Sequence, residues 1–137
     1  MKLFLSEGNP HGVKVLAAAG IWAAQVEIQR LQQEEKVVPF LSQPKLPALE
    51  LDNGSFLFTP NAICRCFYLS AGKETSDLIN QWLEWEATEL QPSVSAALYA
   101  HVVQGRKKED VLQTVNNSLV YIAQNITKKA YLAGVSV

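Results

Sequence analysis

The fold is decided by the stretch Leu46-Pro47-Ala48-Leu49-Glu50-Leu51-Asp52-Asn53-Gly54-Ser55-Phe56-Leu57-Phe58-Thr59-Pro60-Asn61. Two apolar runs, 46–51 and 55–58, flank an Asn-Gly pair, which is the strongest short-range signal for a β-hairpin. Thr59-Pro60 then predicts the start of a helix, because proline is favoured in a first helical turn. We therefore expect two antiparallel strands and a helix that Gly72 closes.

The residues before this stretch predict a strand, a helix and a second strand. An apolar run spans 2–5, a pattern with three- and four-residue spacing begins at Val13, and polar and apolar residues alternate over 25–31. The apolar helix positions are Val13, Leu16, Ala17, Gly20, Ile21 and Ala24. A crossover of this length makes the first two strands parallel. With the hairpin and its helix after them, these elements have the order of a thioredoxin-like α/β layer. A polar stretch and a Pro-containing loop, at 32–44, separate the second strand from the hairpin.

Pro47 stands just before the third predicted strand. Because proline cannot donate a ladder hydrogen bond, it must occupy the first position of that strand. A cis proline is common at this place in thioredoxin-like layers, and an ordinary trans proline at a strand edge is the alternative. The sequence leaves the two open.

Beyond residue 72 the pattern is purely helical. Thr75 or Ser76 caps a helix that is expected to reach about Gln104 and to be bent or broken at Pro92. Its apolar stripe comprises Leu78, Trp82, Trp85, Leu90, Val94, Ala97, Leu98 and Val102. After the break at 105–108, a second helix carries Val111, Val115, Leu119, Ile122 and Ile126. The predicted fold class is thus α/β plus all-α, with domains at 1–72 and 73–137.

The composition is that of an ordinary globular protein. Of 137 residues, 48% are hydrophobic and 18% charged, and the formal net charge is −1. This balance disfavours a dedicated nucleic-acid binder, which usually carries a basic excess. The apolar run within residues 1–7 is far too short for the core of a signal peptide, so none is expected. The longest apolar stretch, 13–24, is interrupted by Lys14 and Gly20, so no membrane span is expected either.

The chemically active side chains show no spacing typical of a metal or catalytic site. Cys64 and Cys66 lie two residues apart on a predicted helix, about 200° around its axis, so they cannot bind one ion. So few cysteines indicate a reducing compartment, the cytoplasm. His11, in a loop, and His101, on a helix, have no motif around them, and we expect solvated or packed roles. Glu84, Glu86 and Glu89 are expected on the solvated face of the tryptophan-bearing helix.

The element order, Leu46-Pro47-Ala48-Leu49 and Thr59-Pro60-Asn61-Ala62-Ile63-Cys64-Arg65 together resemble the glutathione-S-transferase (GST) fold. Three stretches are more narrowly similar to the family of N-terminal domains appended to vertebrate cytoplasmic methionyl-tRNA synthetases. They are Val37-Val38-Pro39-Phe40-Leu41, Asn80-Gln81-Trp82-Leu83-Glu84-Trp85-Glu86-Ala87-Thr88-Glu89-Leu90-Gln91-Pro92 and Val102-Val103-Gln104-Gly105. The resemblance implies a thioredoxin-like layer followed by a helical layer. That layer is expected to be truncated here, because the family continues past Tyr131-Leu132-Ala133-Gly134 into a buried helix.

What the resemblance implies is docking without catalysis or cofactor. The domain would form a heterodimer with a GST-like auxiliary protein of the multi-synthetase complex, and would reach the glutamyl-prolyl-tRNA synthetase indirectly, with weak or no direct tRNA binding. GST-like layers pair through the helix after the hairpin and the first helix of the all-α layer. Residues at three- and four-residue spacing on these helices are the predicted partner interface: Ala62, Arg65, Cys66, Leu69, Asn80, Leu83, Glu84 and Ala87.

Two alternatives concern glutathione and tRNA. In transferases a serine binds the γ-glutamyl carboxylate of glutathione through its hydroxyl and N–H, and here Thr59-Pro60 stands in its place, where Pro60 offers neither. Ser6 is a weak candidate for thiol activation. A tRNA-binding domain would need a basic face, for which the sequence offers 106–108 and Lys128-Lys129. The catalytic signatures of the synthetase do not occur, so we expect no aminoacylation.

Overall fold

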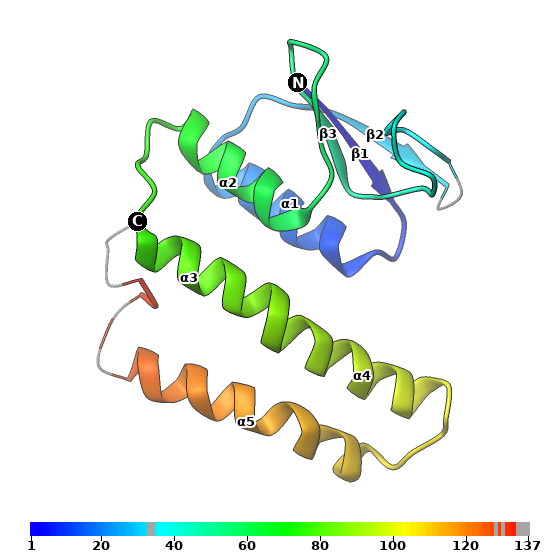
Figure 1. Ribbon diagram of the computed structural model, residues 1–137, viewed down its shortest axis with the longest axis vertical. Coiled ribbons are helices and arrows are strands. Elements are labelled where there is room, and N and C mark those ends of the chain that lie inside the picture. The colour runs from blue at the N-terminus through cyan, green and yellow to red at the C-terminus, as the bar shows by residue number, and fades with distance from the viewer. Residues whose placement is uncertain (33–34, 128, 130, 134–137) are drawn as a thin grey trace. The chain divides into compact units, whose positions relative to one another are not determined.

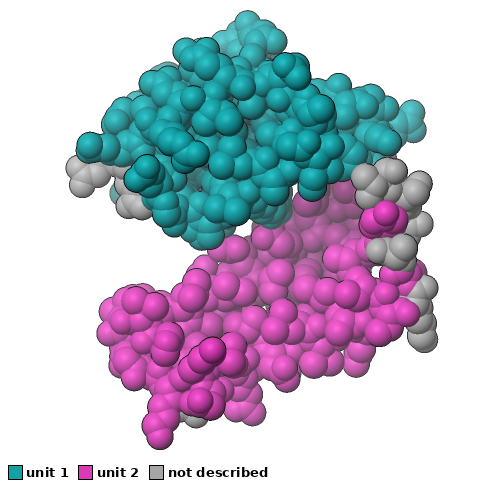
Figure 2. Space-filling model, turned by 180° about the vertical axis from the view of Figure 1, so that it is seen from behind, with its two compact units in different colours: residues 1–74 teal, residues 75–137 magenta. Residues whose placement is uncertain are grey.

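The structure, a computed structural model, describes residues 1–32, 35–127, 129 and 131–133. The protein folds into two compact units, residues 1–74 and 75–137, which Figure 2 colours separately. The first unit combines a sheet with two helices, and the described part of the second is helical (Figure 1).

A four-stranded mixed sheet forms the first unit, with strand order β2-β1-β3-β4. β1 (Lys2–Ser6) pairs in parallel with β2 (Glu27–Leu31) and antiparallel with β3 (Ala48–Glu50), which pairs antiparallel with β4 (Phe56–Leu57). The predicted parallel crossover and hairpin are therefore confirmed. The two hairpin strands are shorter than the apolar runs that predicted them, because the turn extends over 51–55 and residues 46–47 and 58 lie outside the strands.

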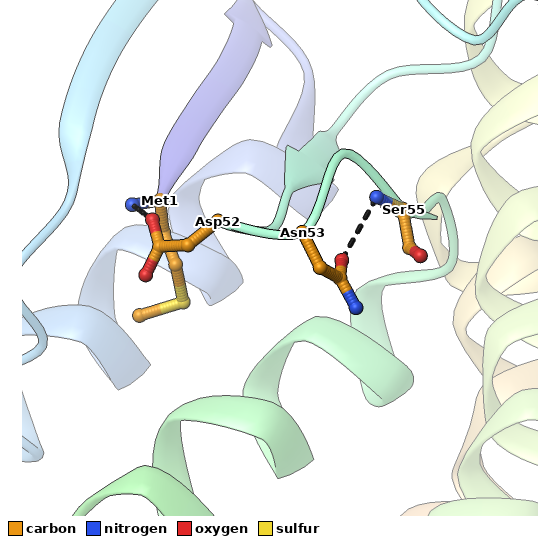
Figure 3. Close-up of polar contacts among 4 residues, drawn as sticks. All are labelled: Met1, Asp52, Asn53 and Ser55. Carbon is orange, nitrogen blue, oxygen red and sulfur yellow. Dashed lines mark hydrogen bonds and ion pairs between the residues drawn. The ribbon is translucent and has the colours of Figure 1, made fainter.

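The hairpin turn is closed by its own polar groups. Gly54 N–H donates to the Leu51 carbonyl at 2.9 Å, and Ser55 N–H donates to Asn53 Oδ1 at 2.9 Å (Figure 3). Gly54 has φ +79°, a conformation that glycine adopts without a steric penalty. The Asn-Gly pair thus favours the turn in two ways. Gly54 adopts the required positive φ, and the Asn53 side chain accepts a backbone hydrogen bond.

Two ion pairs join residues 1 and 2 to the hairpin turn and to β2. The Met1 ammonium lies 2.6 Å from Asp52 Oδ1 in the hairpin turn (Figure 3), and Lys2 Nζ lies 3.8 Å from Glu27 Oε1 on β2. The Asp52 side chain is 86% exposed. Exposed pairs contribute at most about 1 kcal/mol each, so the sheet depends mainly on apolar packing.

The helix α1 (Pro10–Ile21) begins earlier than predicted and buries a different face. Val13 and Ile21, both expected on the apolar stripe, are 69% and 66% exposed. The buried residues are Gly12, Val15 and Ala19. Apolar residues occur almost all round this helix, so their spacing could not select the buried face. The neighbouring sheet selected it instead.

Apolar clusters cover both faces of the sheet. The larger joins the strands to α1 and α2 (Pro60–Ser70), and its buried members are Leu3, Leu5, Val15, Ala19, Leu49, Ile63 and Phe67. The smaller consists of Phe4, Val38 and Ala48. Val38, 1% exposed, comes from the expected loop at 32–44, whose described residues form neither helix nor strand. The loop therefore takes part in the core.

The long helix of the second unit is continuous through Pro92, so of the two predicted outcomes, a bend or a break, the break does not occur. α3 (Asp77–Trp85) leads into a π-helical turn, η1 (Glu86–Leu90), and then into α4 (Gln91–Val102), as Figure 1 shows. In the π turn the Gln91 N–H donates to the Glu86 carbonyl. The wider turn ends just before Pro92, where the missing N–H would interrupt an ordinary α-helical ladder.

α5 (Lys108–Ile126) packs beside this helix and buries Ala97, Val111 and Val115 between the two. Trp82 and Trp85 of α3 contact Tyr121 of α5, with ring centroids 5.7 and 5.4 Å away. Several residues of the predicted stripes are nevertheless exposed: Leu78 by 52%, Leu98 by 56%, Val102 by 74%, Leu119 by 50% and Ile126 by 45%. Two helices side by side bury only the strip between them, which is narrower than the apolar stripes of this sequence.

Candidate functional site

The helix α2 carries four of the eight predicted interface residues. Ile63 and Phe67 are fully buried and fix its inner face in the core of the first unit. At 100° per residue, Arg65 lies about 200° from Ile63 and therefore points outward. Arg65 is exposed, and Leu69 is 43% exposed. Together with the half-buried Ala62 and Cys66 they form what we call the α2 surface.

One flank of α2 is covered by α1. Lys14 Nζ donates to Asn61 Oδ1, and the rings of Trp22 and Tyr68 meet edge to face with centroids 5.0 Å apart. Asn61 and Tyr68 lie on the flank of α2 that faces α1. Ala62, Cys66 and Leu69 project from the other side of Arg65 around the helix axis. The α2 surface is thus the flank turned away from α1.

The other four predicted residues lie at the start of the second unit. Ser76 caps α3, accepting the Ile79 N–H at 3.3 Å, which confirms the predicted helix start. The residues Asn80, Leu83, Glu84 and Ala87 form what we call the α3 surface; Asn80 and Leu83 are half-buried, whereas Glu84 and Ala87 are exposed. Glu84 is about 200° from Trp82, so this surface lies opposite the aromatic contacts with α5. Ala87 falls in the π turn rather than in α3.

The transferase features sit where α2 begins. Thr59 is its N-cap residue, but the Thr59 hydroxyl makes no capping bond, and Pro60 is the first helical residue. Position 60 therefore offers neither the hydroxyl nor the N–H with which transferases bind a carboxylate. Ser6, at the end of β1, is 7% exposed.

The remaining residues that the sequence singled out for their chemistry are two cysteines, two histidines and three glutamates. Among the described residues, no three His, Cys, Asp or Glu side chains lie together as metal ligands would. Cys64 and Cys66 are half-buried thiols on α2. His11 lies in the first turn of α1, not in a loop as predicted, and His101 Nδ1 is 2.8 Å from the Arg106 carbonyl oxygen. Of the three glutamates, Glu84 and Glu89 are exposed and Glu86 is half-buried.

The described basic residues considered for tRNA binding lie near the two ends of α5. Arg106, Lys107 and Lys108 are exposed where this helix begins, and Lys129 follows its end. The helix has 19 residues and is about 28 Å long. Lys128 and residues 134–137 lie outside the described part of the protein. Arg106, Lys107 and Lys108 are therefore too far from Lys129 to form one compact patch with it. No described helix is long and apolar enough to cross a membrane.

Sequence reasoning missed Asn9, which joins α1 to the segment before β3. Its Oδ1 accepts the His11 N–H at 2.9 Å, and its Nδ2 donates to the Leu46 carbonyl at 2.9 Å. The following peptide bond, Leu46–Pro47, is cis, which answers the question that the sequence left open. Asn9-Pro10 is a typical N-cap and first-turn pair, so the sequence held a signal for the capping role. It held none for the bond to Leu46.

Known proteins with similar sequences include cytoplasmic methionine–tRNA ligases. The ligase of Xenopus laevis is 66% identical over 130 residues, which are 95% of this chain and 14% of that protein. The ligase of Homo sapiens is 53% identical over 138 residues, 98% of this chain and 15% of that protein. The chain is thus similar over nearly its whole length to the N-terminal part of these ligases, and it spans about one seventh of their length.

The fold has close counterparts among solved structures. Glutathione S-transferase unclassified 2 from Bombyx mori matches with a TM-score of 0.78 at 20% identity, covering 96% of this chain and 69% of that one. Identity this low speaks for the fold alone, a GST-like α/β unit followed by helices. Residues 1–72 match the family model of the glutathione S-transferase N-terminal domain, which is more than half of the chain. The chain therefore belongs to the glutathione S-transferase N-terminal domain family.

Proposed function

We propose that this protein is a non-catalytic docking domain of a cytoplasmic methionyl-tRNA synthetase. It attaches the enzyme to the multi-synthetase complex by forming a heterodimer with another GST-like protein, the small auxiliary protein of that complex. The glutamyl-prolyl-tRNA synthetase is reached indirectly, and the assembly works in the cytosol. The observation that carries this proposal is the α2 surface, an outward flank of a firmly anchored helix that α1 leaves uncovered.

The α2 surface has the chemistry of a specific interface. Leu69 and the small side chains of Ala62 and Cys66 provide an apolar area, and Arg65 adds a charge with several donors. Interfaces typically combine an apolar centre with a polar rim, and arginine is enriched among the residues that dominate binding. Because Ile63 and Phe67 hold the helix in the core, this surface is rigid before a partner arrives. Rigidity lowers the entropy lost on binding.

The α3 surface also supports pairing with a partner protein, and its charge is opposite in sign to that of the α2 surface. Its exposed charge is the carboxylate of Glu84, whereas the α2 surface carries the cation of Arg65. A fitting partner would place an acidic side chain against Arg65 and a basic one against Glu84. Such complementarity sets partner choice and orientation, because misplaced like charges are costly.

Glutathione chemistry is disfavoured by the start of α2. A carboxylate that is desolvated against Pro60 gains no donor there, at a cost of about 1–3 kcal/mol or more. A glutathione-agarose column provides a direct test. We expect the protein to pass through it unretained, and elution by free glutathione would instead support the transferase alternative.

The main test is complex formation with the auxiliary protein, measured by light scattering after size-exclusion chromatography and by calorimetry. We expect a one-to-one complex with the wild-type protein. Arg65→Glu should weaken binding by about 10- to 100-fold, because it sets like charges together. Glu84→Lys should do the same independently.

The matched control is Arg30→Glu, an equal charge reversal at an exposed position of the edge strand β2. It should leave the affinity unchanged, and circular dichroism should show all three variants folded. Equal affinity of wild type and Arg65→Glu would remove the α2 surface from the interface. Absence of any complex with the folded wild-type protein would overturn the choice of partner.

A further inference from the structure

The tip of the β3–β4 hairpin combines a side-chain amide with an adjacent unhindered backbone nitrogen. Asn53 and Gly54 are both exposed, and a Cβ built on Gly54 would meet no other atom within 4 Å. We propose that Asn53 is a site of spontaneous deamidation, and that local opening of this turn controls its rate. The proposal is independent of the docking function.

The reaction needs only water. The Gly54 backbone nitrogen gives up its proton to solvent and attacks Cγ of Asn53, and the bond between Cγ and Nδ2 breaks as ammonia leaves with a proton. The product is a five-membered succinimide. Water then opens the ring at one of its two carbonyl groups, which yields either aspartate or isoaspartate at position 53. Glycine favours the attack because it has no side chain to obstruct the nitrogen.

In the closed turn both reacting groups are occupied. The Gly54 N–H donates to the Leu51 carbonyl at 2.9 Å, and Asn53 Oδ1 accepts the Ser55 N–H at 2.9 Å (Figure 3). Attack requires the nitrogen to leave its acceptor and the amide to rotate. Both bonds lie at an exposed hairpin tip, where local opening costs far less than global unfolding. The fraction of molecules in which the turn is open therefore sets the rate of the reaction.

The two products would affect the hairpin differently. Aspartate keeps an oxygen that can accept the Ser55 N–H, so the turn survives with one more negative charge on a protein of net charge −1. Isoaspartate adds a methylene group to the backbone between the two strands. The pairing of Glu50 with Phe56 begins just beyond the turn, so the longer connection would disturb that register.

The experiment compares the purified protein in native buffer and in unfolding urea, both at mildly alkaline pH. Peptide mapping by mass spectrometry follows conversion of amide to acid at each asparagine. Asn53→Asp supplies the standard for the aspartate product. Asn9 is the internal blank, because the nitrogen of Pro10 carries no hydrogen. Asn117, exposed on α5 and followed by Ser118, shows how an unfavoured site responds to unfolding.

We expect Asn53 to be the dominant site in both conditions and to react about 30-fold faster in urea, the factor that corresponds to the net free energy of two neutral hydrogen bonds. Equal rates of Asn53 conversion in native buffer and in urea would show that the closed turn does not slow the reaction. Acceleration of about 10⁴-fold or more would mean that reaction needs global unfolding, which also overturns local control. No conversion at Asn53 in urea would overturn the site itself.

Discussion

Replacement of Asn9 separates two interactions that one side chain makes. The amide oxygen caps α1 through the His11 N–H, and the amide nitrogen binds the Leu46 carbonyl. Asn9→Ser keeps a capping oxygen but is too short to reach Leu46 with a donor. Asn9→Ala removes both. The three proteins therefore form a series in which the two bonds are lost one after the other.

The expected magnitudes follow from the environment. Both bonds are part-buried, so water replaces them incompletely. Loss of the bond to Leu46 should cost about 1 kcal/mol, the usual net contribution of a neutral hydrogen bond. Loss of an N-cap costs about 1 kcal/mol more, while serine and asparagine cap about equally well. We expect unfolding free energies lower by about 1 kcal/mol for Asn9→Ser and about 2 kcal/mol for Asn9→Ala.

The assay must report the first unit alone. Of the three tryptophans, only Trp22 lies in that unit, where it contacts Tyr68. In a background with Trp82→Phe and Trp85→Phe, urea unfolding followed by fluorescence therefore measures this unit. The midpoint should fall along the series with an unchanged dependence on urea.

The matched control for this series is Asn117→Ala, at an exposed position of the second unit. It should not shift the Trp22 transition. A midpoint for Asn9→Ser equal to that of the wild type would show that the bond to Leu46 contributes nothing. Equal midpoints for Asn9→Ser and Asn9→Ala would refute the capping contribution.

Two aromatic truncations should differ in cost because the rings differ in burial. Phe67→Ala removes a fully buried ring and should lower the stability of the first unit by about 3–5 kcal/mol; a loss below about 1 kcal/mol in the Trp22 assay would contradict its core position. Trp82→Ala removes a half-buried ring that packs on Trp85 and Tyr121 and should cost about 2 kcal/mol. An unchanged melting temperature would show that this cluster adds no stability.

Features that depend on neighbours in the sequence were predictable. The Asn53-Gly54 turn and the Ser76 cap each use atoms within three residues of the signal. The parallel direction of the first two strands and the antiparallel hairpin followed as well, because a long crossover and a tight turn fix these directions. The resemblance to the glutathione-S-transferase fold rested on the element order and on two short stretches, 46–49 and 59–65.

Features that depend on a distant partner were not predictable. The apolar residues of α1 surround the helix, and only the sheet decided that Val15 is buried while Val13 is exposed. Pro92 signals a bend or a break in the helix, yet the helix continues through it after a π turn. A rule for proline considers one hydrogen bond, whereas a continuous helix gains from all the packing on either side of that bond.

The sequence by itself determined the elements, their order and the family, since these follow from periodicity, turn residues and short motifs. Only the tertiary structure decided which flank of α2 faces α1, that the basic residues stand at opposite ends of α5, and that Asn9 reaches Leu46. The physical reason is the distance along the sequence over which each interaction acts. A residue's conformation responds to its neighbours in the sequence, but its exposure and its polar partners depend on residues brought near by folding, here up to 51 positions away.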